Sequence, residues 1–199
     1  MRPISEHRAK AAERERWLRY GAAAAAVATT AVVGSLPVDP AGSWYRSLRK
    51  PVWQPPSWLF GVVWPPLYAS LALAGGHAFG RARGMERKGL AIDLGANLLL
   101  NAAWPWLFFA CRSPRAGVAG TLLLDAGNAQ LIRRVARFDA VAARTLLPYA
   151  AWCTFATALN TSIARRNTTR AWMVSPSWWS RRRPRRRTRR QWRGHGRGR

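Results

Sequence analysis

Residues 44–68 read WYRSLRKPVWQPPSWLFGVVWPPLY and intersperse four tryptophans with five prolines. Pro51, Pro55 and Pro56 lack a backbone N–H and disfavour helical geometry at the preceding residue, so the first half of this stretch cannot be a helix interior. Residues 59–79 contain no Asp, Glu, Lys or Arg and are long enough to cross a bilayer as a helix. Because tryptophan and tyrosine favour the membrane interface, the stretch predicts an aromatic surface loop followed directly by a transmembrane helix.

Charge is distributed in blocks along the 199 residues of the chain, a length natural for one domain. The net charge is +25 and the mean hydropathy is −0.20, an average that on its own argues weakly against a membrane protein. The charged residues, however, are concentrated in residues 1–19, 81–88, 133–144 and 165–199, and the stretches between these blocks are nearly free of charge. This alternation is typical of a chain that crosses a membrane several times.

Five largely apolar stretches predict an all-α fold, an integral membrane bundle of five transmembrane helices. They comprise residues 17–36, 59–80, 89–111, 115–132 and 140–164. The fourth stretch is the weakest, because Asp125, Asn128 and Gln130 interrupt it. In the third, Asn97 and Asn101 lie four residues apart on one helix face, which predicts that they point into the bundle and form hydrogen bonds between helices.

The chain divides into a polar leader over residues 1–16, a transmembrane domain over residues 17–167 and an arginine-rich tail over residues 168–199. The tail also contains tryptophan, cannot bury a core and is predicted to be disordered. The arginine-rich composition of the tail predicts binding to anionic lipid. The second alternative is that the tail has no role, and the third is that it binds nucleic acid. The leader and the basic loops favour an orientation with the N-terminus inside, whereas the positive charge of the tail, on the opposite side of five helices, opposes it. The orientation is therefore left open, and so is the identity of the membrane. Cys111 and Cys153 lie in apolar stretches and are predicted to be buried.

The segment at residues 44–68 resembles the TspO/MBR family, also known as tryptophan-rich sensory proteins, translocator proteins or peripheral benzodiazepine receptors, whose pattern is WY..L.KP.W.PP.W.F..VW..LY. Two further matches follow in the expected order, LNAAWPWLFFACR at residues 100–112 and LLPYAAWCTFATALN at residues 146–160. The resemblance covers residues 17–167 and excludes the tail. It implies a multi-pass membrane protein with five helices that forms a homodimer.

The resemblance further implies a pocket, capped by the loop between the first two helices, that binds porphyrin-type tetrapyrroles such as protoporphyrin IX and haem as ligands rather than as obligatory cofactors. A porphyrin is a flat aromatic system with anionic propionates, and Arg46, Arg49 and Lys50 on the loop are predicted to pair with those propionates. The matching motif positions, together with a tryptophan near the same face as Asn101, predict ligand contacts at Tyr45, Pro55, Trp64, Asn101, Trp104, Trp152 and Ala156.

Three functions follow from the resemblance. The first is a sensor or transporter in tetrapyrrole homeostasis or stress response. The second is a porphyrin-degrading enzyme that depends on light and oxygen and uses Trp64 and Trp152. The third is a lipid or sterol transporter, although residues 159–166 (LNTSIARR) lack the tyrosine of the sterol-recognition pattern in animal members. Without the resemblance, the aromatic residues indicate packing or interface anchors. Metal-ligand spacings, nucleophile motifs and glycine-rich phosphate loops are absent from the sequence, which predicts no metal site and argues against an ordinary hydrolase, kinase or dehydrogenase.

Overall fold

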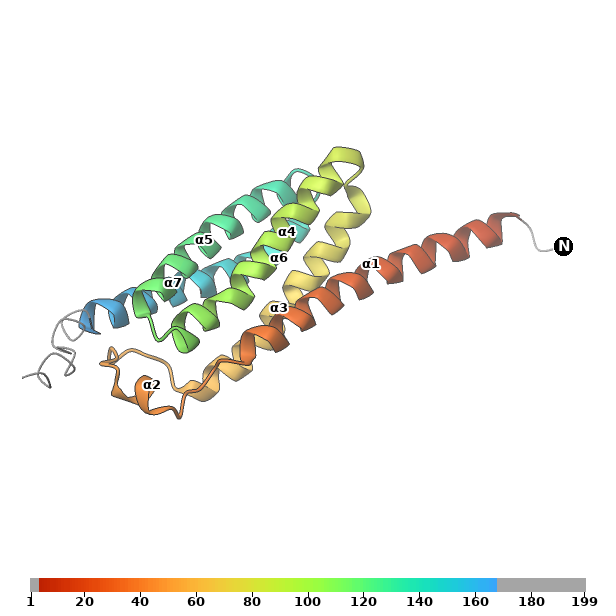
Figure 1. Ribbon diagram of the computed structural model, residues 1–199. Helices are drawn as coiled ribbons and strands as arrows, with labels where there is room; N and C mark the ends of the chain where they lie inside the picture. The colour runs from red at the N-terminus through yellow and green to blue at the C-terminus, as the bar shows by residue number, and fades with distance from the viewer. Residues whose placement is uncertain (1–3, 168–199) are drawn as a thin grey trace, which may run out of the picture. The chain divides into compact units, whose positions relative to one another are not determined.

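Long helices joined by short connections account for most of residues 4–167, the part of the chain that the computed structural model describes (Figure 1). The long helices are α1 (Ile4–Ser35), α3 (Ser57–Arg81), α4 (Gly84–Pro105), α5 (Pro114–Ala136) and α7 (Leu147–Asn167). The shorter elements are α2 (Ser43–Ser47), a π-helical turn (Trp106–Ala110) and α6 (Ala140–Thr145). No strand occurs within residues 4–167, so the predicted all-α class is confirmed. The predicted tail lies outside the described residues.

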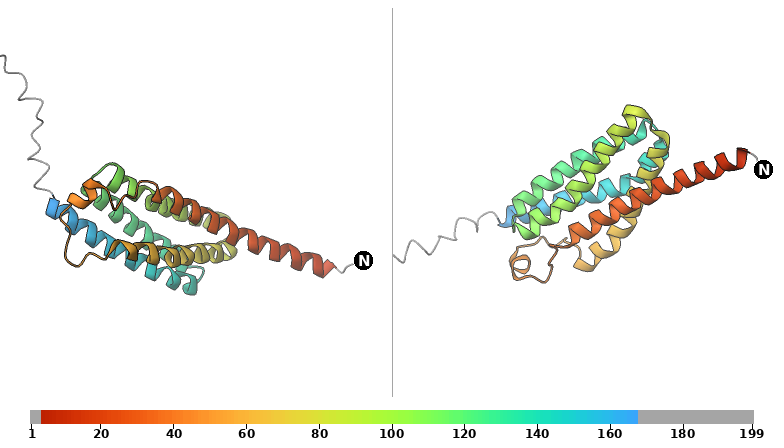
Figure 2. Two further views of the ribbon diagram at one scale, coloured as in Figure 1. Left: turned by 90° about the horizontal axis from the view of Figure 1, so that it is seen from below. Right: turned by 45° about the vertical axis from the view of Figure 1, so that its right-hand side comes forward.

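Among the described helices, only α3 combines the length and the hydropathy that a membrane crossing requires. The other long helices contain more charged and polar residues, which lower their mean hydropathy. The predicted bundle of five transmembrane helices therefore stays a prediction, although each predicted stretch coincides with a long helix in chain order. Helix α1 begins within the predicted polar leader, and its N-terminal end extends past the other helices (Figure 2).

The fifth predicted span is divided into two helices. Helix α6 ends at Thr145 and α7 begins at Leu147, so the prediction of one helix over residues 140–164 is wrong at this point. Pro148 explains the division, because it has no N–H to donate to the carbonyl group four residues earlier. Helical hydrogen bonding resumes at Ala150, whose N–H donates to the carbonyl oxygen of Leu146 at 3.0 Å.

The helices pack in pairs around a core that runs the length of the bundle. Helix α1 packs along α3, α4 along α5, and α5 along α7. Leu71 and Leu90 are almost completely buried at the centre of this core. Gly76 allows α1 to approach α3 closely, because a Cβ atom at this position would collide with the Tyr20 ring. Cys153 is buried as predicted, whereas the prediction is wrong for Cys111, which is exposed after the π-helical turn.

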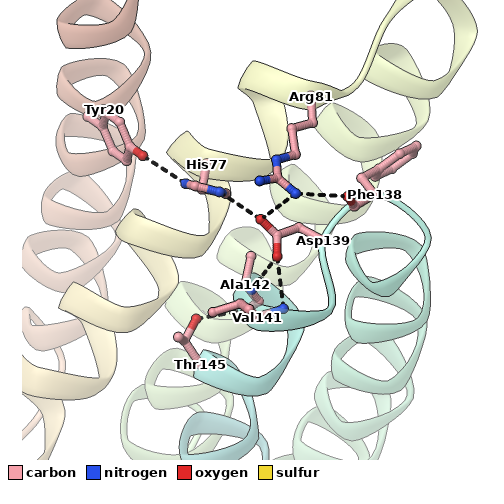
Figure 3. A network of polar contacts seen from close by, with 8 residues as sticks. All are labelled: Tyr20, His77, Arg81, Phe138, Asp139, Val141, Ala142 and Thr145. Carbon is pink, nitrogen blue, oxygen red and sulfur yellow. Dashed lines mark hydrogen bonds and ion pairs between the residues drawn. The ribbon is translucent and has the colours of Figure 1, made fainter.

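Asp139 lies nearly buried at the end of the bundle where α3 finishes, and it connects three parts of the fold (Figure 3). Its Oδ1 atom accepts two backbone N–H bonds from the first turn of α6, at 2.8 and 3.1 Å. Its Oδ2 atom lies 2.7 Å from Nε2 of His77 and 3.2 Å from the guanidinium of Arg81, both on α3. The hydroxyl of Tyr20 on α1 lies 3.1 Å from Nδ1 of His77. We call these four residues the Asp139 cluster.

Candidate functional site

A cavity of about 470 Å³ lies in the half of the bundle nearest α2, between α1, α3, α4 and α7. Its volume is in the range of small-molecule binding sites. It is lined by Ala31, Gly34 and Ser35 of α1, Val38, Pro40 and Tyr45 of the connection to α3, Ser57, Phe60, Gly61, Trp64, Pro65 and Tyr68 of α3, Asn101, Trp104 and Pro105 of α4, Phe108 and Phe109 of the π-helical turn, and Ala156, Leu159, Asn160 and Ile163 of α7.

Seven aromatic side chains contribute to the walls of this cavity. Trp64 and Tyr68 stack on α3 with their ring centroids 5.0 Å apart, and Trp104 stacks on Phe108 with centroids 5.5 Å apart. The spacing explains the pair on α3, because residues four apart on an α-helix lie on the same face. Tyr45 closes the wall from α2, with its ring 5.3 Å from that of Phe109. Aromatic faces on α3 and α4 suit a flat, aromatic ligand.

Asn101 is the polar residue at the centre of the site, and its side chain is fixed by neighbours on two other helices. Its Oδ1 atom accepts a hydrogen bond from the Tyr68 hydroxyl at 2.8 Å, and its amide donates to the Tyr149 hydroxyl at 2.9 Å. The Tyr149 hydroxyl donates in turn to Asn97 at 3.0 Å, and the Asn97 amide donates to Asn128 at 2.6 Å. We call these five residues the asparagine–tyrosine network. It confirms that Asn97 and Asn101 form hydrogen bonds between helices.

A second cavity of about 40 Å³ adjoins the first. The two cavities share the lining residues Phe60, Trp64, Asn101, Trp104 and Ala156. The smaller cavity is lined in addition by Thr121, Leu124, Trp152 and Cys153. The indole N–H groups of Trp104 and Trp152 are buried and have no hydrogen-bond partner. Because an unpaired buried donor costs about 1–3 kcal/mol, a ligand that brings an acceptor to these indoles gains affinity.

The cations predicted to lie at the rim sit beside the cavity rather than in its wall. The Lys50 ammonium lies 3.7 Å from the centre of the Tyr45 ring, and Tyr45 accepts a hydrogen bond from the Gln54 amide at 3.2 Å. Burial lowers the pKa of the Lys50 ammonium and raises the pKa of Tyr45. The backbone of Arg49 is held by two hydrogen bonds, both 3.0 Å, to the side chain of Asn167 at the end of α7. Arg46 is exposed.

The structure brings most of the predicted contact residues to one place. Tyr45, Trp64, Asn101, Trp104 and Ala156 line the larger cavity, and Trp152 lines the smaller one. Pro55, Arg46, Arg49 and Lys50 line neither cavity. Sequence reasoning missed the lining residues Phe60, Tyr68, Phe108, Phe109, Leu159, Asn160 and Ile163. Several of them could have been found by helical spacing, since Phe60 and Tyr68 lie four residues on either side of Trp64, and Asn160 lies four residues after Ala156.

The sequence pattern described as the TspO/MBR family matches residues 22–166. The chain belongs to the TspO/MBR family. It is 35% identical to the human translocator protein over 127 residues, which cover 62% of this chain and 75% of that relative. It is 34% identical to the tryptophan-rich protein TspO of Chlorobaculum tepidum over 129 residues, which cover 64% and 82% of the two chains. It is 32% identical to the tryptophan-rich sensory protein of Cereibacter sphaeroides over 152 residues, which cover 76% and 90%.

The TspO/MBR assignment places both cavities inside the matched region, because every lining residue lies between residues 22 and 166. TspO/MBR proteins are membrane proteins, and α3 is long and apolar enough to cross a membrane. The helix that supplies Trp64 and Tyr68 to the cavity is therefore the described helix best suited to lie in the bilayer.

Proposed function

We propose that this TspO/MBR protein is a multi-pass membrane protein that binds a porphyrin-type tetrapyrrole, such as protoporphyrin IX or haem, in the cavity below α2. It would act as a sensor or transporter in tetrapyrrole homeostasis or stress response. The observation that carries the proposal is the aromatic cavity itself, which presents stacked rings from α3 and α4 around a space of about 470 Å³. A porphyrin offers large π faces to such walls.

The polar groups of the site support the same class of ligand. The free indole N–H of Trp104 can donate to a ligand carbonyl or carboxylate. Lys50 lies directly behind Tyr45, close enough to the wall for a flexible lysine to turn toward a propionate at the cavity mouth. Most of the remaining lining is apolar, so a ligand that is flat, largely apolar and acidic at one edge matches the site better than a small polar metabolite.

The pattern of exposure supports several membrane crossings. Large apolar side chains are exposed on several helices, for example Leu73 on α3, Leu99 on α4 and Leu122 on α5. The polar residues Asn97 and Asn128, by contrast, are buried inside the bundle. An apolar exterior with the polar side chains turned into the bundle is the arrangement that lipid favours. A homodimer, which is also part of this proposal, would cover part of the apolar exterior.

Filling the cavity should weaken binding of protoporphyrin IX. Gly61 lines the cavity, and a Cβ atom at this position meets no other atom within 4 Å, so a side chain can begin there without displacing the backbone. We expect Gly61→Leu to lower the affinity by about tenfold or more, because the leucine side chain occupies space that the ligand needs. Saturable quenching of tryptophan fluorescence by protoporphyrin IX in detergent measures this affinity.

The matched control is Gly95→Leu. Gly95 lies on a long helix, has equally free space around it and lines neither cavity, so this variant should bind like the wild type. Trp64→Phe should also weaken binding, since the phenyl ring offers a smaller face than the indole. Linear, unsaturable quenching that is identical in all variants would mean that the porphyrin partitions into the micelle, and it would overturn the proposal.

One observation favours a second function, the oxygen- and light-dependent breakdown of bound porphyrin. Trp64 and Trp152 come from different helices, yet they line the same small cavity. A porphyrin in the larger cavity would therefore face Trp64, with Trp152 in the adjoining small cavity, and both indoles can be oxidised. Under illumination in air, the wild type should lose the Soret absorption of bound protoporphyrin, and Trp152→Phe should retain it while still binding the ligand. Equal loss in the two proteins would exclude a role for Trp152 in this reaction.

A further inference from the structure

Asp125 occupies the middle of α5 and has no positively charged partner. The ion pairs of the described residues join Arg19 to Glu15, His77 and Arg81 to Asp139, and Arg134 to Asp93. The Oδ2 atom of Asp125 accepts a hydrogen bond from the Thr157 hydroxyl at 2.7 Å. The Oδ1 atom is buried without a hydrogen-bond partner. Asp93 on α4, by contrast, is neutralised by Arg134.

The surroundings of the Asp125 carboxyl are neutral. Helix α5 packs along α7, which presents Thr157 and the buried thiol of Cys153 to this position. Asn128, one turn further along α5, and Tyr149 lie close to that thiol. The Cys153 thiol and the Tyr149 phenol are neutral at pH 7, because thiol and phenol groups ordinarily titrate above neutral pH. Asn97 of α4, which donates to Asn128, is also neutral. No group around Asp125 therefore compensates a negative charge at neutral pH.

The hydrogen bonds of Thr157 indicate which form of the carboxyl fits this site. The Thr157 hydroxyl lies 2.7 Å from the Asp125 carboxyl and 3.1 Å from the carbonyl oxygen of Cys153, but it has only one proton to donate. If the carboxyl is protonated, Asp125 donates to Thr157 and Thr157 donates to the carbonyl. If the carboxyl is ionised, one of these two contacts has no proton. The protonated acid therefore satisfies both contacts.

We propose that Asp125 is an intramembrane proton-binding site, a carboxylic acid that stays protonated at neutral pH and can release its proton inside the bundle. Asp125 is half-buried, but its Oδ1 atom is buried and unpaired, which disfavours the charged carboxylate. An ionisable residue at membrane depth commonly marks a functional site. Cys153 also lies close to Asn128 and Tyr149 of the asparagine–tyrosine network, which reaches Asn101 on the cavity wall. The proton site is therefore next to a polar network that ends at the cavity. The inference rests on the multi-pass topology proposed above and not on the identity of the ligand.

Dicyclohexylcarbodiimide tests the proposal, because this apolar reagent enters the bilayer and reacts with protonated carboxyl groups. The full chain in phosphatidylcholine liposomes is treated with the reagent at a series of pH values, and peptide mass spectrometry locates the adduct. We expect an adduct on Asp125 at pH 7, no adduct at this position in Asp125→Asn, and about tenfold less or none on the ion-paired Asp93 of the same molecules. Labelling should fall by about tenfold per pH unit above the pKa of the carboxyl.

A water-soluble carbodiimide with an amine nucleophile provides the contrasting measurement, and exposed Glu86 serves as its positive control. If Asp125 reacts with neither reagent while protoporphyrin still quenches tryptophan fluorescence saturably, the proton site is wrong and tetrapyrrole binding stands. If Asp125 reacts with the water-soluble reagent as readily as Glu86, α5 does not lie in the membrane, and the multi-pass topology is wrong together with the proton site.

Discussion

Asn97→Ala should lower the free energy of unfolding by about 3 kcal/mol, the sum of two unsatisfied polar groups and a small void. Asn97 has no exposed surface, and it links three helices. Its amide donates to Asn128 on α5, and its carbonyl oxygen accepts from the Tyr149 hydroxyl on α7. Alanine removes both bonds and leaves both partners buried. The loss is large because the interior offers these partners no water in exchange.

Unfolding in detergent by heat or by sodium dodecyl sulfate, followed by circular dichroism, measures this change. Gln130→Ala is the matched control, because Gln130 is an exposed amide on α5 and its loss should change stability by less than about 0.5 kcal/mol. Tyr149→Phe combined with Asn97→Ala should cost less than the sum of the two single changes, since each removes the bond they share. A loss in Asn97→Ala no larger than that in Gln130→Ala would contradict the role assigned to the network.

The positions of the long helices could be predicted because charge blocks and prolines are local features of the sequence. The pairing of Asn97 and Asn101 with other helices followed from their spacing of four residues and from the cost of exposing amides to lipid. Their partners could not be predicted in the same way. Tyr68 and Tyr149 lie 33 and 48 residues from Asn101 in the chain, and nothing in local periodicity specifies which helices become neighbours.

The lining residues of the candidate site could be predicted where a family motif covers them, and the prediction was incomplete elsewhere. The motif gave Trp64 and Ala156, but the rings that complete the wall, such as Phe108, depend on the π-helical turn that follows Pro105. That turn shifts the helical register by one residue, which periodicity cannot anticipate. For the predicted rim cations, the sequence indicates the segment on which they lie but not where their charged groups are placed. A sequence shows that Lys50 lies on the loop, but only the fold shows that its ammonium rests on the Tyr45 ring.

Acidification should destabilise the fold through Asp139, and Asp139→Asn should remove much of that dependence. The backbone N–H of Ala142 on α6 is the main cause that holds the pKa of the Asp139 carboxyl below its usual range. Burial opposes this effect, and the N–H of Val141 and the charges of Arg81 and His77 lower the pKa further. A carboxyl whose pKa is lowered by folding stabilises the protein above its unfolded pKa of about 3.9. This contribution is lost as the pH falls from about 4 through the lowered pKa of the folded state.

Asparagine separates the charge of Asp139 from its capping role, because its side-chain oxygen can still accept the N–H bonds of α6 while its amide group faces Arg81 and His77 without attraction. Asp139→Asn should therefore lower the melting temperature by several degrees at pH 7, and its melting temperature should change less than that of the wild type between pH 5 and pH 3. Thermal denaturation in detergent across this range measures both effects, and Glu86→Gln, which neutralises an exposed carboxyl, provides the control. Parallel pH profiles for the wild type and Asp139→Asn would show that the charge of Asp139 does not hold α1, α3 and α6 together. A flatter profile in Asp139→Asn alone would place the acid sensitivity of the bundle at this cluster, far along α3 from the cavity.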